Sequence, residues 1–409
     1  MINTDYTLAK DNEGLSTWRF ILRELRPKGK IFTPFNIISL PIMLLGFALI
    51  VIRFWKGIGS VTNLTQEVPW GIWIGFDVVT GVAFAGGAYV LTFMVYILNM
   101  KKYKSIVRAT VLNGFLAYVF YAGALLIDLG RPWNVVNPII GNGFGTSSVL
   151  FLVAWHFLLY MLAELIEFSP AIAEWLGKRR IHKILSGMTI AAVVFGITLS
   201  TLHQSGLGAM YLMAKDKIHP LWYNEFIPIL FFVSSIFAGL SLVIFEGSIS
   251  NRVFFSQINA KHRKEHHSIL IGLSKICAMA MFAYFFLQVL VFVHGQHWDL
   301  LATRMGYWYL TEMGVFVLLP MILFYYSYRH NNTFMIKLAA VITMLGIIIN
   351  RLNITVIGFK WDAVSHYYPS WMEIVVTLSI IFTEIWIFRW VINRMPVLRD
   401  SPAWAKDNH

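Results

Sequence analysis

Apolar stretches of about 20 residues recur along the chain and are separated by short polar segments. A helix of this length can cross the hydrocarbon core of a bilayer. The pattern predicts ten spanning helices, each end placed to within several residues: 34–55, 72–99, 106–127, 147–168, 183–204, 226–248, 269–294, 305–328, 334–357 and 372–393. We therefore expect an all-α, polytopic membrane protein.

The segments between these stretches are too short to fold as separate domains. The longest, residues 249–268, is rich in Lys, Arg and His. We expect one transmembrane domain over residues 31–395, an N-terminal cytoplasmic tail over 1–30 and a C-terminal cytoplasmic tail over 396–409. The first thirty residues lack the short apolar core of a signal peptide, so the helices themselves are expected to direct insertion.

The composition supports a membrane location. Of the 409 residues, 57% are apolar and only 13% are charged, whereas roughly a quarter are charged in a soluble protein. The net charge of +12 raises the alternative of nucleic-acid binding. However, the basic residues lie in short blocks between apolar stretches, as in the loops of membrane proteins. We therefore expect no nucleic-acid partner.

Lys and Arg are distributed unequally between alternate loops. The two tails and the loops after even-numbered helices carry 24 of the 33, the other loops carry eight, and Lys275 lies inside the seventh helix. Cytoplasmic loops are the ones enriched in Lys and Arg. The bias predicts a cell inner membrane protein with both termini in the cytoplasm, which requires an even number of helices.

The single cysteine, Cys277, limits the redox chemistry of the chain itself. It excludes an internal disulfide, a Cys-ligated iron–sulfur cluster and a Cys-x-x-Cys-His haem attachment. A b-type haem needs two facing axial ligands, but His156 is expected in mid-span while His203 and His294 lie at outer helix ends. We therefore expect neither haem nor a resident metal, and electrons must come from another molecule.

Several ionisable residues lie inside predicted spans, where each charge costs about 2.5–3.5 kcal/mol at the centre of the bilayer. Asp77, Asp128, Arg131 and His203 are expected in the outer third, on helices 2, 3 and 5. One interpretation is structural pairing, for example Asp128 with Arg131. Convergence of the group on one membrane side favours a functional site instead. Further ionisable residues lie deeper or nearer the cytoplasm: His156, Glu164, Glu167, Glu246 and Glu384.

The stretch TLHQSGLGAMYL, residues 201–212, places His203 and Gln204 where the fifth helix is expected to reach the outer face. A neutral imidazole near pH 7 can donate, accept and relay a proton, and Gln204 can orient it. The alternative is a helix cap in which Gly206 and Gly208 turn the chain. The motif alone leaves both interpretations open.

Four stretches resemble the NrfD/PsrC family, and within it the HybB-type membrane subunit of uptake nickel–iron hydrogenases. They are PWGIWIGFDVVTGVAFAGGAYV (69–90), LLIDLGRPWNVVNP (125–138), the region from TLHQSGLGAMYL to IFEGS (201–248) and YYPSWMEI (367–374). The resemblance extends from about residue 30 to residue 395. It implies two four-helix bundles, about 72–204 and 226–357, with helices 1 and 10 flanking them.

The resemblance implies a membrane anchor of an anaerobic respiratory oxidoreductase complex. Such a subunit passes electrons between a periplasmic, ferredoxin-like iron–sulfur partner and the quinone pool, with menaquinone or ubiquinone as exchangeable substrate. It is not expected to act on the primary substrate by itself, and hydrogenase large and small chains are the expected catalytic partners. The alternatives are an NrfD-type quinol dehydrogenase subunit of a molybdenum reductase or multihaem cytochrome complex, and a secondary transporter.

The resemblance also implies roles for individual residues. His203, Tyr118 and Asp77 are expected to act in catalysis, with Asp128, Arg131 and Gln204 completing the quinone site. Proton transfer, with or without translocation across the membrane, is expected to use a second set: His156, Glu164, Glu246, Arg351 and Glu384. One position departs from the pattern, because Leu152 stands where HybB-type relatives carry a glutamate. His156 or Glu164 is expected to replace that acid.

Overall fold

The computed structural model describes residues 16–28, 30–141 and 145–406, so residues 1–15 and 407–409 of the predicted tails lie outside the described residues. The described chain is almost entirely helical, with one isolated antiparallel bridge between Ile218 and Phe359. Ten of its helices are long and apolar enough to cross a membrane. The predicted polytopic all-α fold is therefore confirmed.

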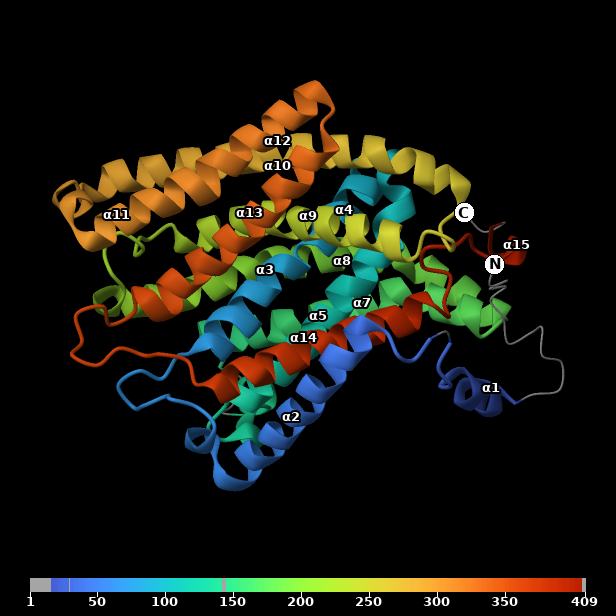
Figure 1. The fold of residues 1–409 in the computed structure, drawn as a ribbon, viewed down its shortest axis with the longest axis horizontal. Helices are drawn as coiled ribbons and strands as arrows, with labels where there is room; N and C mark the ends of the chain where they lie inside the picture. Colours follow the sequence, from blue (N-terminus) through green and yellow to red (C-terminus); the bar gives the residue numbers. More distant parts are fainter. Residues whose placement is uncertain (1–15, 29, 142–144, 407–409) are drawn as a thin grey trace.

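The ten spans follow one another in chain order (Figure 1). They are α2 (Pro34–Lys56); η3 (Trp73–Thr80), α3 (Gly81–Ala85), α4 (Gly87–Thr92) and η4 (Phe93–Ile97); η5 (Lys101–Tyr103) with α5 (Lys104–Asp128); α7 (Val149–Trp175); α8 (Arg179–Tyr211) with η7 (Leu212–Lys217); α9 (Ile227–Val253); α10 (Ala260–Gly295); α11 (Arg304–Thr311), η9 (Glu312–Leu318) and α12 (Leu319–His330); α13 (Thr333–Leu352) with η10 (Asn353–Ile357); and α14 (Trp371–Ile392). Short helices lie between or beside them: α1 (Thr17–Glu24), η2 (Ile58–Ser60), η6 (Pro132–Asn134), α6 (Asn137–Ile140), η8 (Asp299–Ala302) and α15 (Ala403–Lys406).

Polar residues set several helix boundaries. At the start of α14 the Ser370 hydroxyl accepts from the N–H of Met372 at 3.2 Å, and the Glu373 carboxylate accepts from the N–H of Ser370 at 2.8 Å. This reciprocal capping box satisfies N–H groups that have no partner inside the helix. Between α12 and α13, Asn331 adopts a left-handed φ of 53° and Asn332 caps the next helix. The Asn-Asn pair therefore reverses the chain in a tight turn.

The second span, η3 to η4, is the most enclosed of the ten and packs against α5, α8, α9 and α13. Glycines make its contact with α9 close. A Cβ on Gly87 would lie 2.7 Å from the carbonyl oxygen of Gly239, and one on Gly239 would lie 1.9 Å from the backbone nitrogen of Gly87. The two backbones touch, as small residues allow in membranes.

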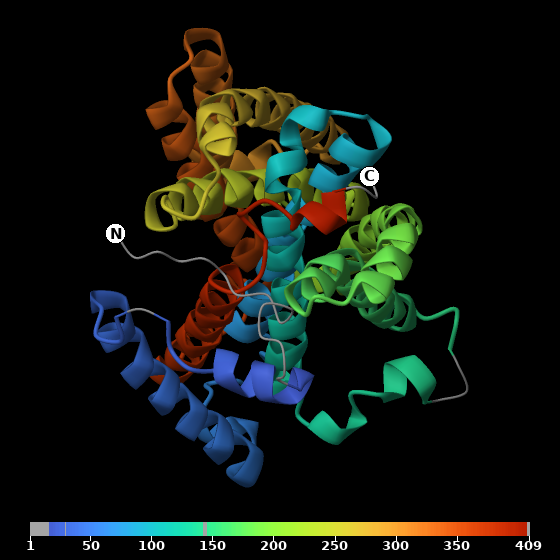
Figure 2. The ribbon, with the colours of Figure 1, turned by 90° about the vertical axis from the view of Figure 1, so that its right-hand side faces the viewer.

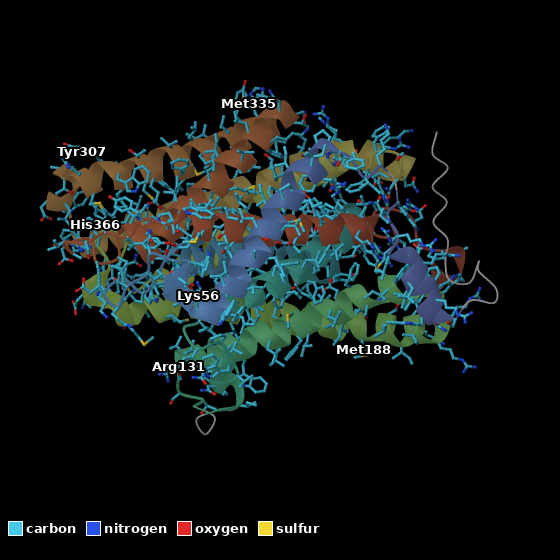
Figure 3. All side chains as sticks on the ribbon, turned by 60° about the horizontal axis from the view of Figure 1, so that its bottom comes forward. Lys56, Arg131, Met188, Tyr307, Met335 and His366 are labelled. Atoms are coloured by element: carbon cyan, nitrogen blue, oxygen red, sulfur yellow. The ribbon has the colours of Figure 1, made fainter. Side chains whose placement is uncertain are left out.

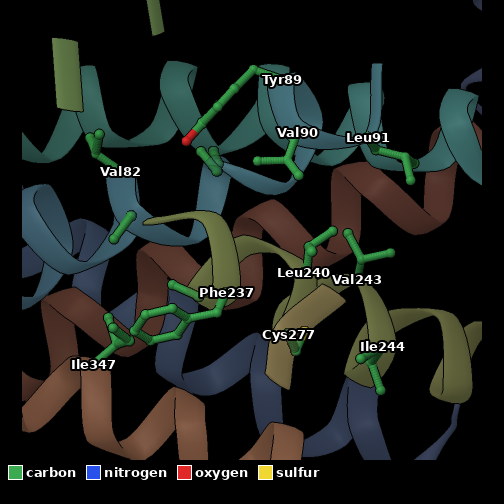
Figure 4. Packing of buried hydrophobic residues seen from close by; sticks show 14 of the residues in the cluster. Val82, Tyr89, Val90, Leu91, Phe237, Leu240, Val243, Ile244, Cys277 and Ile347 are labelled. Atoms are coloured by element: carbon green, nitrogen blue, oxygen red, sulfur yellow. The ribbon is translucent and has the colours of Figure 1, made fainter. Parts of the chain in front are cut away.

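The remaining helices surround this span. α7 and α8 form an antiparallel hairpin, and α9, α10, α12 and α13 pack as neighbours. α2 and α14 lie side by side and contact α5, away from the orange α11–α12 region (Figure 2). Buried apolar residues such as Val82, Leu91, Phe237 and Leu240 fill the space where α3 and α4 meet α9 (Figure 4). The division into two four-helix bundles stays a prediction.

α1 and α15 lie at the same end of the molecule (Figure 1). Near this end Glu174 of α7 is fully buried and forms a bidentate ion pair with Arg108 of α5, at 2.7 and 2.9 Å. His182 of α8 contacts the same carboxylate at 3.0 Å. Bidentate contact between guanidinium and carboxylate is among the stronger polar interactions in proteins. The cluster therefore ties three helices together at the end that carries α1 and α15.

Candidate functional site

Tyr118 of α5 and His203 of α8 meet inside the helix bundle. Their ring centroids are 5.8 Å apart, and both side chains are almost fully buried, at 0% and 1% exposure. Phe157 of α7 packs on both rings, at 5.1 Å from Tyr118 and 5.5 Å from His203. Three consecutive spans therefore position one aromatic cluster around a single imidazole.

A backbone contact orients the imidazole of His203. Its Nδ1 lies 3.1 Å from the carbonyl oxygen of Val153, a residue on α7. Because a carbonyl only accepts, Nδ1 carries the proton in this contact. In the neutral ring Nε2 is then a free acceptor, and in the protonated ring it is a donor. The arrangement therefore leaves Nε2 available for proton exchange.

Several other buried polar atoms near Tyr118 also lack a hydrogen-bond partner. Among the described residues, buried side-chain atoms of this cluster without a hydrogen-bond partner are His203 Nε2, Tyr118 Oη, Tyr160 Oη, Ser200 Oγ and both carboxyl oxygens of Glu164. The Tyr118 and Ser200 hydroxyls lie near each other, as do Tyr160 and Glu164, but neither pair has hydrogen-bond geometry. Each unsatisfied buried group costs about 1–3 kcal/mol. The cluster is therefore suited to holding a polar ligand or water.

Glu164 enters the cluster through a gap at a glycine. A Cβ on Gly114 of α5 would lie 2.4 Å from Glu164 Oε1 and 2.7 Å from the Cβ of Ala88. Only a residue without a side chain leaves room for the carboxyl group between α5 and α7. The glycine thus explains how an acid reaches the side of Tyr160, one helical turn earlier on α7.

Gln204 faces a different neighbour from His203. Its Nε2 donates a hydrogen bond of 2.7 Å to the carbonyl oxygen of Val82 on α3. The bond joins α8 to the second span, directly beside the imidazole in the chain. Gln204 therefore holds the helix that carries His203 and does not join the unpartnered cluster.

Asp77 and Asp128 form a second group, between α2, α5 and α14. The Asp77 carboxylate accepts a hydrogen bond of 2.8 Å from the Thr377 hydroxyl of α14, and it interacts electrostatically with Asp128. The cation beside Asp128 is Arg53 of α2, which also donates to the carbonyl oxygens of Ile127 and Leu129. The contacts of these two acids are therefore with Thr377, Arg53 and each other, and their place in one quinone site with His203 stays a prediction.

Arg131 belongs to neither group. It is exposed in the loop after α5, away from the helix bundle (Figure 3). The structural alternative that pairs Asp128 with Arg131 is corrected here, because Arg53 takes that place. Arg53, on the first span, is thus the cation that interacts electrostatically with Asp128, while Arg131 is exposed in the loop after α5.

Tyr121 lies between the two groups and was missed by the sequence reasoning. It interacts electrostatically with both Tyr118 and Asp77, and its ring covers Gly81, where a Cβ would lie 2.3 Å from Tyr121 Cζ. Tyr160 and Ser200 were missed too. Helical spacing could have indicated all three, since each lies three or four residues from a predicted site residue on the same helix.

The predicted proton-transfer residues are divided among separate places. His156 is partly exposed and interacts electrostatically with His203, and Glu164 lies in the unpartnered cluster. Glu246 and Glu384 are electrostatic neighbours across α9 and α14. Glu246 also lines a cavity of about 70 Å³ together with His262 and His266. Between this cavity and Glu164 the described structure shows no continuous chain of hydrogen bonds.

Arg351 lies in a polar network among α9, η9 and α13. It donates to Asn350 Oδ1 and to Ser234 Oγ, both at 2.7 Å, and its guanidinium carbon lies 3.7 Å from the ring centroid of Phe231. Asn350 in turn donates to Glu312 at 2.7 Å. The carboxylate of Glu312 also accepts from Trp222 at 2.7 Å and Asn353 at 2.6 Å. The network thus satisfies Glu312 and connects it to Arg351.

Residues 60–360 match the family model described as Polysulphide reductase, NrfD. The chain belongs to the NrfD family. A protein of Nitratidesulfovibrio vulgaris whose name states no activity is 42% identical over 381 residues, which are 93% of this chain and 98% of its own.

Two further relatives carry informative names. The probable Ni/Fe-hydrogenase 2 b-type cytochrome subunit of Escherichia coli is 29% identical over 91% of this NrfD-family chain and 95% of its own. The integral membrane subunit of menaquinone reductase from Nitratidesulfovibrio vulgaris is 28% identical over 78% of this chain and 80% of its own. The predicted family and the predicted HybB-type likeness are therefore confirmed.

Haem, which the name of the Escherichia coli relative implies for that protein, does not fit the residues around His203 in this NrfD-family chain. The ring centroids of Tyr118 and Phe157 lie 5.8 and 5.5 Å from that of His203, so aromatic side chains fill space that a macrocycle would need beside this imidazole. A b-type haem needs two axial side chains facing one another across a macrocycle. Within the described residues there is also no group of three or more His, Cys, Asp and Glu that could hold a metal ion.

Proposed function

We propose that this chain is the quinone-reactive membrane subunit of a respiratory oxidoreductase complex in the bacterial inner membrane. In this proposal it passes electrons between a periplasmic iron–sulfur partner of a nickel–iron hydrogenase and menaquinone or ubiquinone. The observation that carries the proposal is the pair of buried rings of His203 and Tyr118, with centroids 5.8 Å apart, whose Nε2 and hydroxyl both lack a hydrogen-bond partner. The names of the hydrogenase and menaquinone reductase relatives support it.

Quinone reduction adds two electrons and two protons, one proton to each carbonyl oxygen, and quinol oxidation removes them. His203 exchanges one proton through Nε2 while its Nδ1 stays bonded to Val153. The Tyr118 hydroxyl, unpartnered on α5, supplies the second contact. Positioned donors of this kind typically contribute about 10²–10⁴-fold to rate. In this proposal the electrons come from the partner, because a chain with one cysteine cannot itself hold a Cys-ligated iron–sulfur cluster.

In our proposal, His203 and Tyr118 are resupplied with protons during quinone reduction by Glu164, Tyr160 and Ser200. Their unpartnered oxygen atoms are suited to bound water between α5, α7 and α8. Whether charge crosses the membrane depends on the side from which these protons come. Unchanged electrogenic activity of the E164Q/E246Q double variant in liposomes would remove the proposed route from the cytoplasm.

A second candidate is a quinol dehydrogenase subunit that serves a reductase instead of a hydrogenase. It is favoured by a 24% identity to a selenate reductase subunit of Mesobacillus selenatarsenatis, over 78% of this chain. The hydrogenase assignment is preferred because the hydrogenase subunit of Escherichia coli aligns over 91% of this chain. Mass spectrometry of proteins purified with the chain distinguishes the two, because the catalytic partners differ. The match to the NrfD family leaves the secondary transporter unsupported.

The experiment compares two electron acceptors in the purified complex. His203→Gln is expected to lower electron transfer to a soluble quinone at least a hundredfold, while a viologen dye still takes electrons directly from the partner. Tyr118→Phe removes only the hydroxyl and should slow the same step. The matched control is His294→Gln, which replaces an exposed imidazole at the C-terminal end of α10. Wild-type quinone activity in His203→Gln would contradict the proposal.

A further inference from the structure

A large cavity lies on the side of the second span that carries Tyr89 and is lined by Thr201 of α8, the residue after Ser200 of the imidazole cluster. Its volume is about 900 Å³, within the usual range of sites for molecules of moderate size. The second span, α8, α9, α10 and α12 all contribute to its walls. Exposed Met279 and Phe93, at 63% and 37%, show that the cavity reaches the lateral surface of the molecule. Its mouth therefore faces the region that lipid occupies.

The interior of the cavity is apolar. Val90 and Met94 of the second span, Ile197 of α8 and Ile236 of α9 line it. Along the second span this wall runs from Tyr89 to Leu98, a rise of about 13 Å. One leaflet of a bilayer has a hydrocarbon depth of about 15 Å. The apolar wall therefore matches the depth of acyl chains in a single leaflet.

Basic side chains gather at one end of the same cavity. Lys101 and Lys102 come from η5, and Lys275 comes from the middle of α10. Gly272 brings them together, because a Cβ there would lie 2.9 Å from Lys102 Nζ, and Lys275 follows one turn later on α10. Tyr328 faces Lys275, with Nζ 5.6 Å from its ring centroid.

No carboxylate neutralises these three lysines in the part of the chain that the structure describes. The ion pairs found there involve Glu24 and Glu174, and neither acid contacts the lysines. Three cations beside an apolar cavity are complementary to a molecule with an anionic head and apolar tails. Basic pockets between spanning helices are known to hold anionic phospholipid head groups.

We propose that this cavity binds one anionic phospholipid, with its phosphate between Lys101, Lys102 and Lys275 and its acyl chains against the second span, α8 and α9. The lipid fills the space between these helices and α10, in the leaflet on the side of α1 and α15. Lipid binding in this cavity does not depend on the proposed quinone chemistry.

The test measures binding of dipalmitoyl phosphatidylglycerol to the delipidated full-length chain in detergent by native mass spectrometry. Dipalmitoyl phosphatidylcholine, which has the same tails and no net charge, is the comparison lipid. Wild type should bind phosphatidylglycerol at least tenfold more tightly. The double variant K102Q/K275Q should weaken phosphatidylglycerol about thirtyfold, from the usual contribution of each lysine, and leave phosphatidylcholine unchanged.

Matched variants separate this site from general surface charge. K183Q/K337Q removes two exposed lysines at the same end of the molecule but outside the cavity, and should retain wild-type affinity. Ile276→Trp fills the cavity without changing charge and should weaken both lipids, whereas Ile322→Trp on the exposed face of α12 should not. Equal loss in both lysine pairs would overturn the proposal. So would loss of copurified quinone, instead of phospholipid, from K102Q/K275Q.

Discussion

The hydroxyl of Thr377 donates a hydrogen bond of 2.8 Å to the carboxylate of Asp77, a residue 300 positions earlier in the chain. The bond joins α14, the last span, to η3 at the start of the second. Asp77 is only 4% exposed, so this contact is made within the packed protein. The bond therefore connects α14 to the enclosed second span. α14 itself packs mainly against α2.

Thr377→Val should therefore destabilise the protein, because it leaves a buried carboxyl group without its donor. The expected loss is about 1–3 kcal/mol in the free energy of unfolding. Thr383→Val is the matched control on the same helix, since its hydroxyl bonds only to the carbonyl oxygen of Ser379 one turn earlier. Thermal unfolding in detergent, followed by tryptophan fluorescence, measures both. Equal shifts in the two variants would show that the bond to Asp77 contributes nothing specific.

Gly114→Ala should damage both packing and quinone reduction. The new Cβ would meet Glu164 Oε1 at 2.4 Å and Ala88 at 2.7 Å, and overpacking of this kind typically costs about 1–3 kcal/mol. Displacement of the Glu164 carboxyl should also slow quinone turnover while dye reduction by the partner continues. Gly123→Ala is the control on α5, because nothing lies within 4 Å of its added Cβ. If both variants keep wild-type turnover, Glu164 does not serve the cluster.

Arg351→Gln should lower the yield and stability of the folded protein as well as its activity. Loss of one member of a buried charged network typically costs about 3–5 kcal/mol, and Arg351 is joined through Asn350 to Glu312. We expect a lower yield of monodisperse protein in size-exclusion chromatography and a lower unfolding temperature. Arg329→Gln, at the exposed end of α12, should behave as wild type. Normal yield with selective loss of proton uptake would instead support the predicted transfer role of Arg351.

Stability should fall as the pH is lowered, in part through His219. This residue lies outside the spans, is 2% exposed, and accepts the N–H of Leu221 on Nδ1 at 3.2 Å. Burial, helped by the nearby His297, lowers the pKa of His219 below its ordinary value. As pH falls through about 6.5, the unfolded chain binds a proton that the folded chain resists, so stability decreases.

The measurement is the unfolding temperature at pH 7.5 and at pH 5.5. His219→Gln should show a smaller decrease between the two than wild type, because its side chain does not titrate. His330→Gln, which replaces an exposed histidine at the end of α12, should keep the wild-type decrease. If the unfolding temperature of His219→Gln falls as much as that of wild type, a group other than His219 causes the pH dependence.

The ten spans could be predicted because their signal is local. Length and apolar composition decide whether a segment can enter a bilayer, and each of the ten predicted stretches corresponds to a helix long and apolar enough to span it. The four stretches that resemble the family, one of them around His203, were equally local, and they led to the family that the comparison then showed. The same reasoning selected Tyr118 and His203, which the structure brings to 5.8 Å between ring centroids.

The partners of the buried polar residues could not be predicted in this way. Arg53 stands beside Asp128, Asp77 reaches Thr377, and Gly114 opens the space for Glu164 only because of how the helices are rotated and packed. In a soluble protein an apolar stripe indicates the buried face of a helix. In a membrane the outward face is apolar too, so hydrophobicity alone does not specify that rotation. The chain by itself therefore determined its spans and its family, and close helix packing at small residues decided which of its charges meet.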